Sequence, residues 1–174
     1  MPITVEQTDI TKLEIEVIVN SVNTALMGGG GVDGAIHRAA GPELLEECKE
    51  HGGCPFGEVR VTKGYNLNCE YIFHTAGPIW KGGTNYEEVK LRNCYLNCMR
   101  ELLKLDKTEI AIPNISTGIY GYPKEEAAQI AISIVSEYVK AIEDQEKDES
   151  KHLKVKFICF EDENYKIYKN LLGL

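Results

Sequence analysis

The sequence predicts an α/β fold in which a mixed sheet is covered by helices on both faces. Strand-like and helix-like segments alternate along most of the chain, a pattern typical of this class. Two strand-like runs, residues 16–22 and 70–77, are largely apolar, as expected for buried strands. The chain has 174 residues, of which 43% are hydrophobic, enough for one domain with a sizeable core. We expect a single domain spanning residues 1–174.

The first fifty residues carry two strand patterns and then two helix patterns. Residues 3–7 (ITVEQ) and 16–22 (EVIVNSV) are strand-like, and the second is an apolar run typical of a buried strand. Residues 32–41 (VDGAIHRAAG) predict a short helix. Residues 41–52 predict another, because Pro42 suits the first turn of a helix and glycines suit its end.

Two strands, a long helix and a further strand are expected next. Residues 58–64 (EVRVTKG) alternate like a strand, and residues 70–77 (EYIFHTAG) form a more buried one. A helix is predicted over residues 86–105 because apolar side chains recur there at steps of four and three: Leu91, Tyr95, Cys98, Leu102 and Leu105. Residues 109–114 (EIAIPN) predict a strand that ends at Pro113.

The last third predicts a helix, a charged connection, a strand and a closing helix. Pro123 opens the helix, whose apolar face carries Ala127, Ile130, Ala131, Ile134 and Tyr138. Residues 142–152 (IEDQEKDESKH) are expected to form a charged surface connection. Residues 153–160 (LKVKFICF) predict a strand and residues 164–172 (NYKIYKNLL) a helix.

Charge and composition disfavour several classes of partner. The net charge of −8 argues against non-specific binding to nucleic acid or to an anionic membrane. No signal-peptide pattern and no membrane-spanning run is recognised. Several of the six cysteines lie within apolar patterns, so we expect reduced core residues and a cytoplasmic location.

One group of residues has a spacing that resembles a metal site. Cys48, His51 and Cys54 follow one another within seven residues of a glycine-rich turn. They lack an obvious fourth ligand. No metal and no other cofactor is therefore expected.

A run of four glycines, Gly28 to Gly31, is the most unusual local feature. It follows the apolar run VIVN and precedes a predicted helix, and ligands of α/β proteins bind where strands lead into helices. Glycines allow close backbone approach, and the free amides of a helix start attract anions. A phosphate or pyrophosphate cradle is the favoured interpretation, and a flexible surface loop is the alternative. The match of Gly29, Gly31 and Gly34 to a dinucleotide fingerprint is weak, because seven residues separate Asn20 from the first glycine.

A second loop of similar character covers residues 113–123 (PNISTGIYGYP). It also follows a strand and precedes a helix, and it contains small residues that favour turns. Two such loops at neighbouring strand ends could clamp one diphosphate. Tyr120 lies close to two glycines and would face the ligand, unless it simply packs over a helix.

The segments NSVN, GGGGVDGAIHRAAG, FHTAGP, IPNISTGIYGYP and ICFEDENYKIY resemble the MacroD-like branch of the macrodomain family in order and spacing. The resemblance covers nearly the whole chain. It implies a three-layer α/β/α sandwich with a central mixed, mostly parallel sheet. It also implies binding of ADP-ribose and hydrolysis of ADP-ribose esters, either on Asp or Glu side chains of proteins or in O-acetyl-ADP-ribose.

The same resemblance implies the residues of the site. Asp9 and Ile10 correspond to residues that bind the adenine, and Phe160 to the aromatic side chain that packs on it. The two loops would wrap the diphosphate and distal ribose through Gly29, Gly30, Gly31, Val32, Ser116, Thr117, Gly118, Ile119 and Tyr120. Asn23 and Asp33 resemble the catalytic pair, of which the asparagine binds a ribose hydroxyl.

Three of these residues also have a purely structural interpretation. Asp33 could be an acid favoured at a helix N-terminus, Asn23 a turn asparagine, and Asp9 a cap for the residues that follow it. His37 lies one helical turn after Asp33 and could contact it, although a surface or core role is favoured. His74 is expected to be structural.

The sequence has no paired-carboxylate signature and no nucleophile–base motif. The reaction must therefore be one that needs little catalytic assistance from the protein. An ester carboxylate leaves readily because its conjugate acid has a pKa of about 4. Asp33 would then align or deprotonate a water. The rival hypotheses are a module that binds ADP-ribose or poly(ADP-ribose) without hydrolysis, a phosphatase acting on ADP-ribose-1''-phosphate, and a nucleic-acid-binding module, which the acidic charge disfavours.

Overall fold

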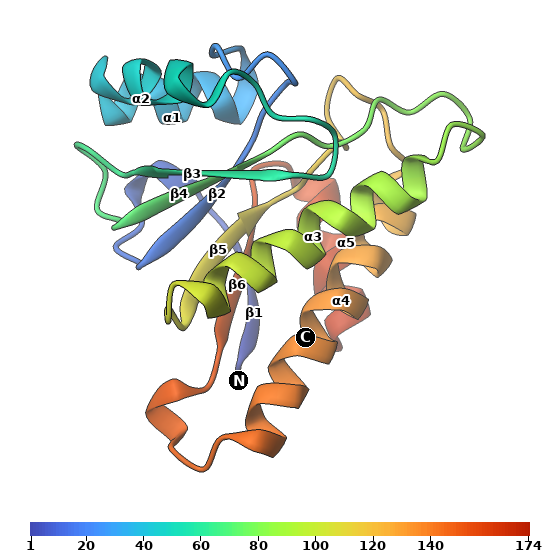
Figure 1. The fold of residues 1–174 in the computed structure, drawn as a ribbon. Coiled ribbons are helices and arrows are strands. Elements are labelled where there is room, and N and C mark those ends of the chain that lie inside the picture. Colours follow the sequence, from blue (N-terminus) through green and yellow to red (C-terminus); the bar gives the residue numbers. More distant parts are fainter.

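A six-stranded sheet lies between two layers of helices in the computed structural model, which describes all 174 residues (Figure 1). The strands are β1 (Ile3–Gln7), β2 (Val17–Ser21), β3 (Val59–Lys63), β4 (Tyr71–Thr75), β5 (Glu109–Pro113) and β6 (Lys154–Cys159). Their order is β1-β6-β5-β2-β4-β3. Every neighbouring pair is parallel except β3 and β4. The predicted sandwich with a mixed, mostly parallel sheet is confirmed.

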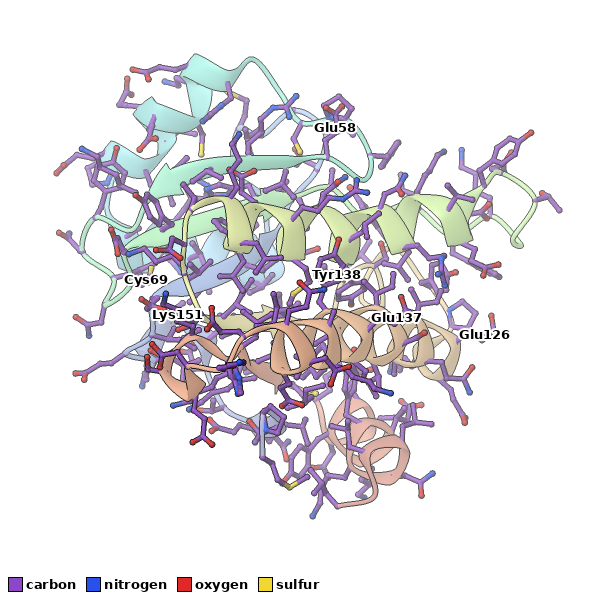
Figure 2. All side chains as sticks on the ribbon, turned by 60° about the horizontal axis from the view of Figure 1, so that its bottom comes forward. Glu58, Cys69, Glu126, Glu137, Tyr138 and Lys151 are labelled. Atoms are coloured by element: carbon purple, nitrogen blue, oxygen red, sulfur yellow. The ribbon has the colours of Figure 1, made fainter.

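Each face of the sheet has its own set of helices and its own core. The helices are α1 (Gly31–Ala40), α2 (Glu43–His51), α3 (Glu87–Lys104), α4 (Lys124–Gln145) and α5 (Asp162–Leu172). In the β2 strand, Val17 and Val19 pack toward α3, α4 and α5, whereas Ile18 packs toward α1 and α2. Figure 2 shows side chains filling the space between the sheet and its helices, with Glu126 and Glu137 of α4 exposed to solvent. The alternation of strand residues thus builds two separate cores.

Several boundaries differ from those expected. The α1 helix begins at Gly31, one residue earlier than predicted, and α5 begins at Asp162. The expectation that residues 142–152 form a connection throughout is wrong, because α4 continues to Gln145 and a short 3₁₀ turn, η2, covers Glu149–Lys151. Ile142 is partly buried against the core and extends the apolar face of α4 by one more turn.

The carboxyl ends of five parallel strands lie at one edge of the sheet. This follows from the parallel pairing of β1, β6, β5, β2 and β4. Ligands of such folds bind outside this edge. Both sequence-predicted loops leave from it, since one follows β2 and the other follows β5.

None of the helices combines the length and the apolar character that crossing a membrane requires. All six cysteines are free thiols, and five of them are buried.

Candidate functional site

The loop after β2 is shaped by the side chain of Asn23. Its Oδ1 accepts hydrogen bonds from the backbone N–H groups of Ala25 (3.1 Å) and Leu26 (3.2 Å), and its Nδ2 donates to the carbonyl of Gly28 (3.3 Å). The turn-forming role considered for Asn23 is therefore present. The side-chain amide of Asn23 has two N–H groups. One of them has no acceptor within the protein, so it can also donate to a ligand.

The glycines differ in what surrounds them. A Cβ on Gly34 would lie 2.7 Å from the carbonyl oxygen of Gly29, so α1 can approach the loop this closely only without a side chain there. A Cβ on Gly30 would meet no atom within 4 Å, and the same holds for Gly31. The middle of the glycine run therefore faces open space above the first turn of α1.

Unpaired backbone amides line this open space. The N–H groups of residues 29–32 donate to no acceptor within the protein, as expected at a helix start. They lie at the positive end of the α1 dipole. This arrangement suits an anionic group such as a phosphate.

Asp33 lies directly beneath the loop, and its two oxygens have different partners. Oδ1 accepts from Asn20 Nδ2 at 2.8 Å and lies 3.3 Å from His37 Nε2. Oδ2 accepts no hydrogen bond from the protein and lies 3.2 Å from where a Cβ on Gly29 would be. Burial raises the pKa of the carboxyl above its ordinary value, while the Asn20 hydrogen bond and the charge of His37 oppose that rise. One oxygen is thus held from within the protein and the other faces the glycine loop.

Asn20, His37 and His74 are parts of the site that the sequence-based assignment left out. Asn20 and His74 face each other across β2 and β4, where Asn20 Nδ2 lies 3.2 Å from His74 Nδ1. The four-residue spacing of Asp33 and His37 indicates their contact from the sequence, because residues four apart lie on one face of a helix. Asn20 and His74 are polar residues inside apolar strands. Buried polar side chains are usually hydrogen-bonded, so the sequence indicates that each has a partner but not which residue it is.

The loop after β5 presents a second set of free amides. The N–H groups of residues 117–120 donate to no acceptor within the protein, and a Cβ on Gly118 would meet no atom within 4 Å. The Ile119 side chain is fully exposed, at 100%. Tyr120 is half-buried. Because β5 is a neighbour of β2, this loop lies beside the glycine loop, as predicted.

The segment after β4 holds the second loop in place. Ser116 has a left-handed backbone with φ of +66°, and its hydroxyl donates to the carbonyl of Pro78 at 2.7 Å. Gly77 packs so closely on Ser116 that a Cβ would overlap its Oγ. The backbone N–H of Trp80 donates to the carbonyl of Tyr120 at 2.8 Å. Contacts with residues that lie 38 to 40 positions earlier in the chain therefore fix the amides of the second loop.

The loops after β1 and β6 form the far end of this edge. Phe160 follows β6 with 85% of its surface exposed. Asp9 is exposed and caps the 3₁₀ turn η1 (Ile10–Lys12), since its Oδ1 accepts from the N–H (3.0 Å) and the hydroxyl (2.7 Å) of Thr11. Ile10 is buried. The capping role considered for Asp9 is present, and its Oδ2 has no partner within the protein.

These loops line up along the edge in the order of the strands. Asp9 and Phe160 lie at one end, the second loop comes next, and the glycine loop with Asp33 follows. The sequence-predicted residues thus come from four different loops at one edge. The arrangement offers an exposed aromatic face, two sets of amides and a buried carboxylate in that order.

A groove of about 490 Å³ elsewhere on the molecule is lined by Glu43, Glu46, Glu47, Glu50, Lys63 and Tyr65. Lys63 pairs with Tyr71 at the start of β4, so the groove lies at the opposite edge of the sheet. Four carboxylates would repel a diphosphate. The loops therefore remain the candidate functional site.

Cys48, His51 and Cys54 are not arranged as metal ligands. Both thiols are buried in the core, and His51 Nε2 lies 3.1 Å from the carbonyl of Val61. No group of three or more His, Cys, Asp and Glu side chains is placed to hold a metal ion.

Comparisons with known proteins agree on one family. The Macro domain family model matches residues 19–131. A macro domain-containing protein of Chlorobaculum tepidum is 50% identical over 165 residues, 95% of this chain and 92% of that protein. The O-acetyl-ADP-ribose deacetylase of Escherichia coli is 46% identical over 174 residues, 97% of this chain and 93% of the enzyme.

Solved structures give the same result. The Oceanobacillus iheyensis macrodomain with ADP has a TM-score of 0.87 and 42% identity, and the match covers 97% of this chain and 88% of that one. The Trypanosoma brucei macrodomain in complex with ADP-ribose has a TM-score of 0.89 and 38% identity, and the match covers 99% of this chain and 69% of that one.

Proposed function

The chain belongs to the macrodomain family, and from this premise we propose that it binds ADP-ribose and hydrolyses ADP-ribose esters. The proposed substrates are O-acetyl-ADP-ribose and proteins that carry ADP-ribose on Asp or Glu side chains. The single observation that carries the proposal is the position of Asp33. Its Oδ2 has no protein partner and faces the glycine loop, whose free backbone amides lie beside those of the second loop.

The loops provide what each part of ADP-ribose requires. Adenine would stack on exposed Phe160 and donate its amino hydrogen to Asp9, beside the backbone of Ile10. The diphosphate would accept hydrogen bonds from residues 29–32 and 117–120, whose N–H groups are free. Such local amides suit an anion that the overall charge of −8 would otherwise repel. Asn23 would bind a hydroxyl of the distal ribose.

The chemistry is attack of water on the anomeric carbon of that ribose. Asp33 Oδ2 and a diphosphate oxygen would hold the water, and Asp33 would help to remove its proton. Their negative charge would also stabilise the positive charge that develops on the sugar. The carboxylate of the ester departs without a general acid because its conjugate acid has a pKa of about 4.

Two measurements test this proposal together. Calorimetric titration with ADP-ribose should show one site per chain, and O-acetyl-ADP-ribose should be hydrolysed at a rate proportional to enzyme concentration. Binding without turnover of any ester would instead identify a non-catalytic binding module. Release of phosphate from ADP-ribose-1''-phosphate at the higher rate would identify a phosphatase.

Asp9→Ala is expected to weaken ADP-ribose binding about ten- to a hundredfold, the range for a lost hydrogen bond to a carboxylate. An inosine analogue, which lacks the adenine amino group, should bind poorly to the parent protein and lose little more in the variant. Calorimetry with both ligands measures the effect.

The chain offers a matched control for the lost cap. Asp148 caps η2 through Ser150 with the same two distances, 3.0 and 2.7 Å, and it belongs to no part of the site. Asp148→Ala should leave ADP-ribose affinity unchanged. Equal affinity of the parent protein for ADP-ribose and for the inosine analogue would refute the adenine role of Asp9.

Only carboxylate-linked ADP-ribose should be released quickly. A serine linkage would leave as a strongly basic alkoxide and an arginine linkage also leaves poorly, so both need a proton donor. The nearest histidine, His37, has its Nε2 against Asp33 Oδ1 rather than free for a leaving group. A side-by-side assay of Glu-, Ser- and Arg-linked peptides at equal enzyme concentration measures the selectivity, and comparable rates on Ser and Glu linkages would reveal a proton donor.

A further inference from the structure

A chain of buried hydrogen bonds leads from Asp33 through two strands to β3. Asp33 Oδ1 accepts from Asn20 Nδ2 (2.8 Å), which lies 3.2 Å from His74 Nδ1. His74 Nε2 lies 2.8 Å from the Thr62 hydroxyl. That hydroxyl donates to the backbone carbonyl of Lys63 at 3.2 Å. Four elements of the fold, α1, β2, β4 and β3, are thereby linked.

The burial of this chain calls for an explanation. Asn20 and His74 are 0% exposed and Thr62 is 1% exposed, within the layer where α1 and α2 pack on the sheet. Buried polar side chains cost stability unless they are hydrogen-bonded, and apolar residues of the same shape would fill this layer without that cost. The network also leaves Asn20 Oδ1 buried without a partner, a cost that packing alone does not explain.

The donors and acceptors allow only one direction along the chain. An ionised Asp33 Oδ1 can only accept, so Asn20 turns Nδ2 toward it, and the direction of the other bonds follows: His74 Nε2–H donates to the Thr62 hydroxyl, which donates to the Lys63 carbonyl. The neutral imidazole then has an acceptor at Nδ1, which faces the Asn20 amide nitrogen. The amide directs one N–H to His74 and the other to Asp33 Oδ1. The chain that ends at the Lys63 carbonyl thus matches an ionised Asp33, with Asn20 Nδ2 facing the carboxylate.

We propose that Asn20, His74 and Thr62 are positioning residues that hold Asp33 ionised, with Oδ2 turned toward the ligand loops. The inference rests on the proposed function in that Asp33 is taken to act on the attacking water. With Thr62 unable to accept, the His74 proton would move to Nδ1 and the Asn20 amide would turn its oxygen toward that nitrogen. Asn20 Oδ1 would then face Asp33 Oδ1, and the two oxygens would repel unless the carboxyl took up a proton.

Few other titratable groups face Asp33. They are His37 on its own helix, Cys48 on α2 and, beyond Asn20, His74 on β4. Burial raises the pKa of Cys48 to about 11 and lowers the pKa of His74 to about 3, so both are neutral from pH 5 to 9. His37 is present in every variant proposed below. A change in the acidic limb of a pH profile between variants therefore reports on the Asp33–His37 pair, and the NMR titration described below assigns it to Asp33.

Thr62→Val is the main test because it removes the hydroxyl and keeps the shape. We expect the kcat of ester hydrolysis at pH 7 to fall several-fold, with little change in KM. The acidic limb of the kcat profile should move to higher pH, by up to about one pH unit, the scale of one hydrogen bond to a charged group. Asn20→Leu should move the limb further in the same direction, because it removes the donor to Asp33 directly.

Two further variants separate positioning from general damage. Thr62→Ser keeps the hydroxyl and should restore the parent profile. Thr75→Val removes an equally buried hydroxyl, which donates to the Glu58 carbonyl at 2.8 Å. This control variant should leave the pH profile of kcat unchanged. In an Asp33→Ala background, Thr62→Val should have no further effect on the residual rate, since the network acts only through Asp33.

An NMR titration decides the inference independently of turnover. The ¹³C signal of the Asp33 carboxyl should titrate at higher pH in Thr62→Val than in the parent, and the ¹⁵N shifts of His74 should report an Nε2–H tautomer in the parent. No turnover by the parent enzyme on any ester would overturn the proposed function but leave this titration decisive. An identical Asp33 pKa in the parent, Thr62→Val and Asn20→Leu would overturn the positioning role.

Discussion

Asp33→Ala is expected to slow ester hydrolysis by about a hundredfold or more, the usual scale for loss of a general base. ADP-ribose affinity should change far less, because the diphosphate and adenine contacts proposed above come from backbone amides and from residues other than Asp33. The effects on turnover and on binding should differ because only Oδ2 of Asp33 faces the glycine loop, while Oδ1 accepts from Asn20. Single-turnover rates on O-acetyl-ADP-ribose and calorimetric titration with ADP-ribose measure them.

Asp33→Asn provides the matched control. It keeps the size of the side chain and an oxygen that can accept from Asn20, whereas alanine leaves the buried Asn20 amide without its acceptor, at a cost of about 1–3 kcal/mol. Both variants should lose turnover, and the asparagine variant should retain more of the free energy of unfolding. A parallel loss of binding and turnover in both would show that Asp33 is a binding residue and that the proposed mechanism is wrong.

Gly30→Glu is expected to abolish ADP-ribose binding while the protein remains folded. No atom lies within 4 Å of a Cβ at Gly30, so the fold has room for the new side chain. That room is the space we assign to the diphosphate, which the carboxylate would both fill and repel. Calorimetric titration measures the loss, and circular dichroism confirms the fold.

The choice of glycine matters for this test. Gly31 has open space too, but its φ of +59° would strain any other residue, so Gly31→Glu would change two properties at once. Gly118→Glu in the second loop should have the same effect as Gly30→Glu, because that position is also open. Undiminished affinity in a folded Gly30→Glu protein would refute the cradle.

The sequence predicted the type of nearly every element, because burial imposes a local period on each of them. Apolar runs marked β2 and β4, and four- and three-residue steps marked α3 and α4. The same reasoning missed the last turn of α4, where charged residues surround Ile142 and hide the apolar face. The two loops after β2 and β5 were predicted as well, since glycines and small residues at the end of a strand are a local signal.

The sequence by itself thus determined the fold class, the two loops and, through its motifs, the family. Only the tertiary structure decided which oxygen of Asp33 faces the glycine loop and that a hydrogen-bonded chain of Asn20, His74 and Thr62 leads away from the other. The physical reason is separation along the chain. His74 meets Asn20 through the register of β2 on β4, 54 residues apart, and periodicity within a segment carries no information about the register between segments. The closely packed pair of Gly77 and Ser116 arises in the same way, because two strand ends at one edge of a parallel sheet bring together residues that no local pattern connects.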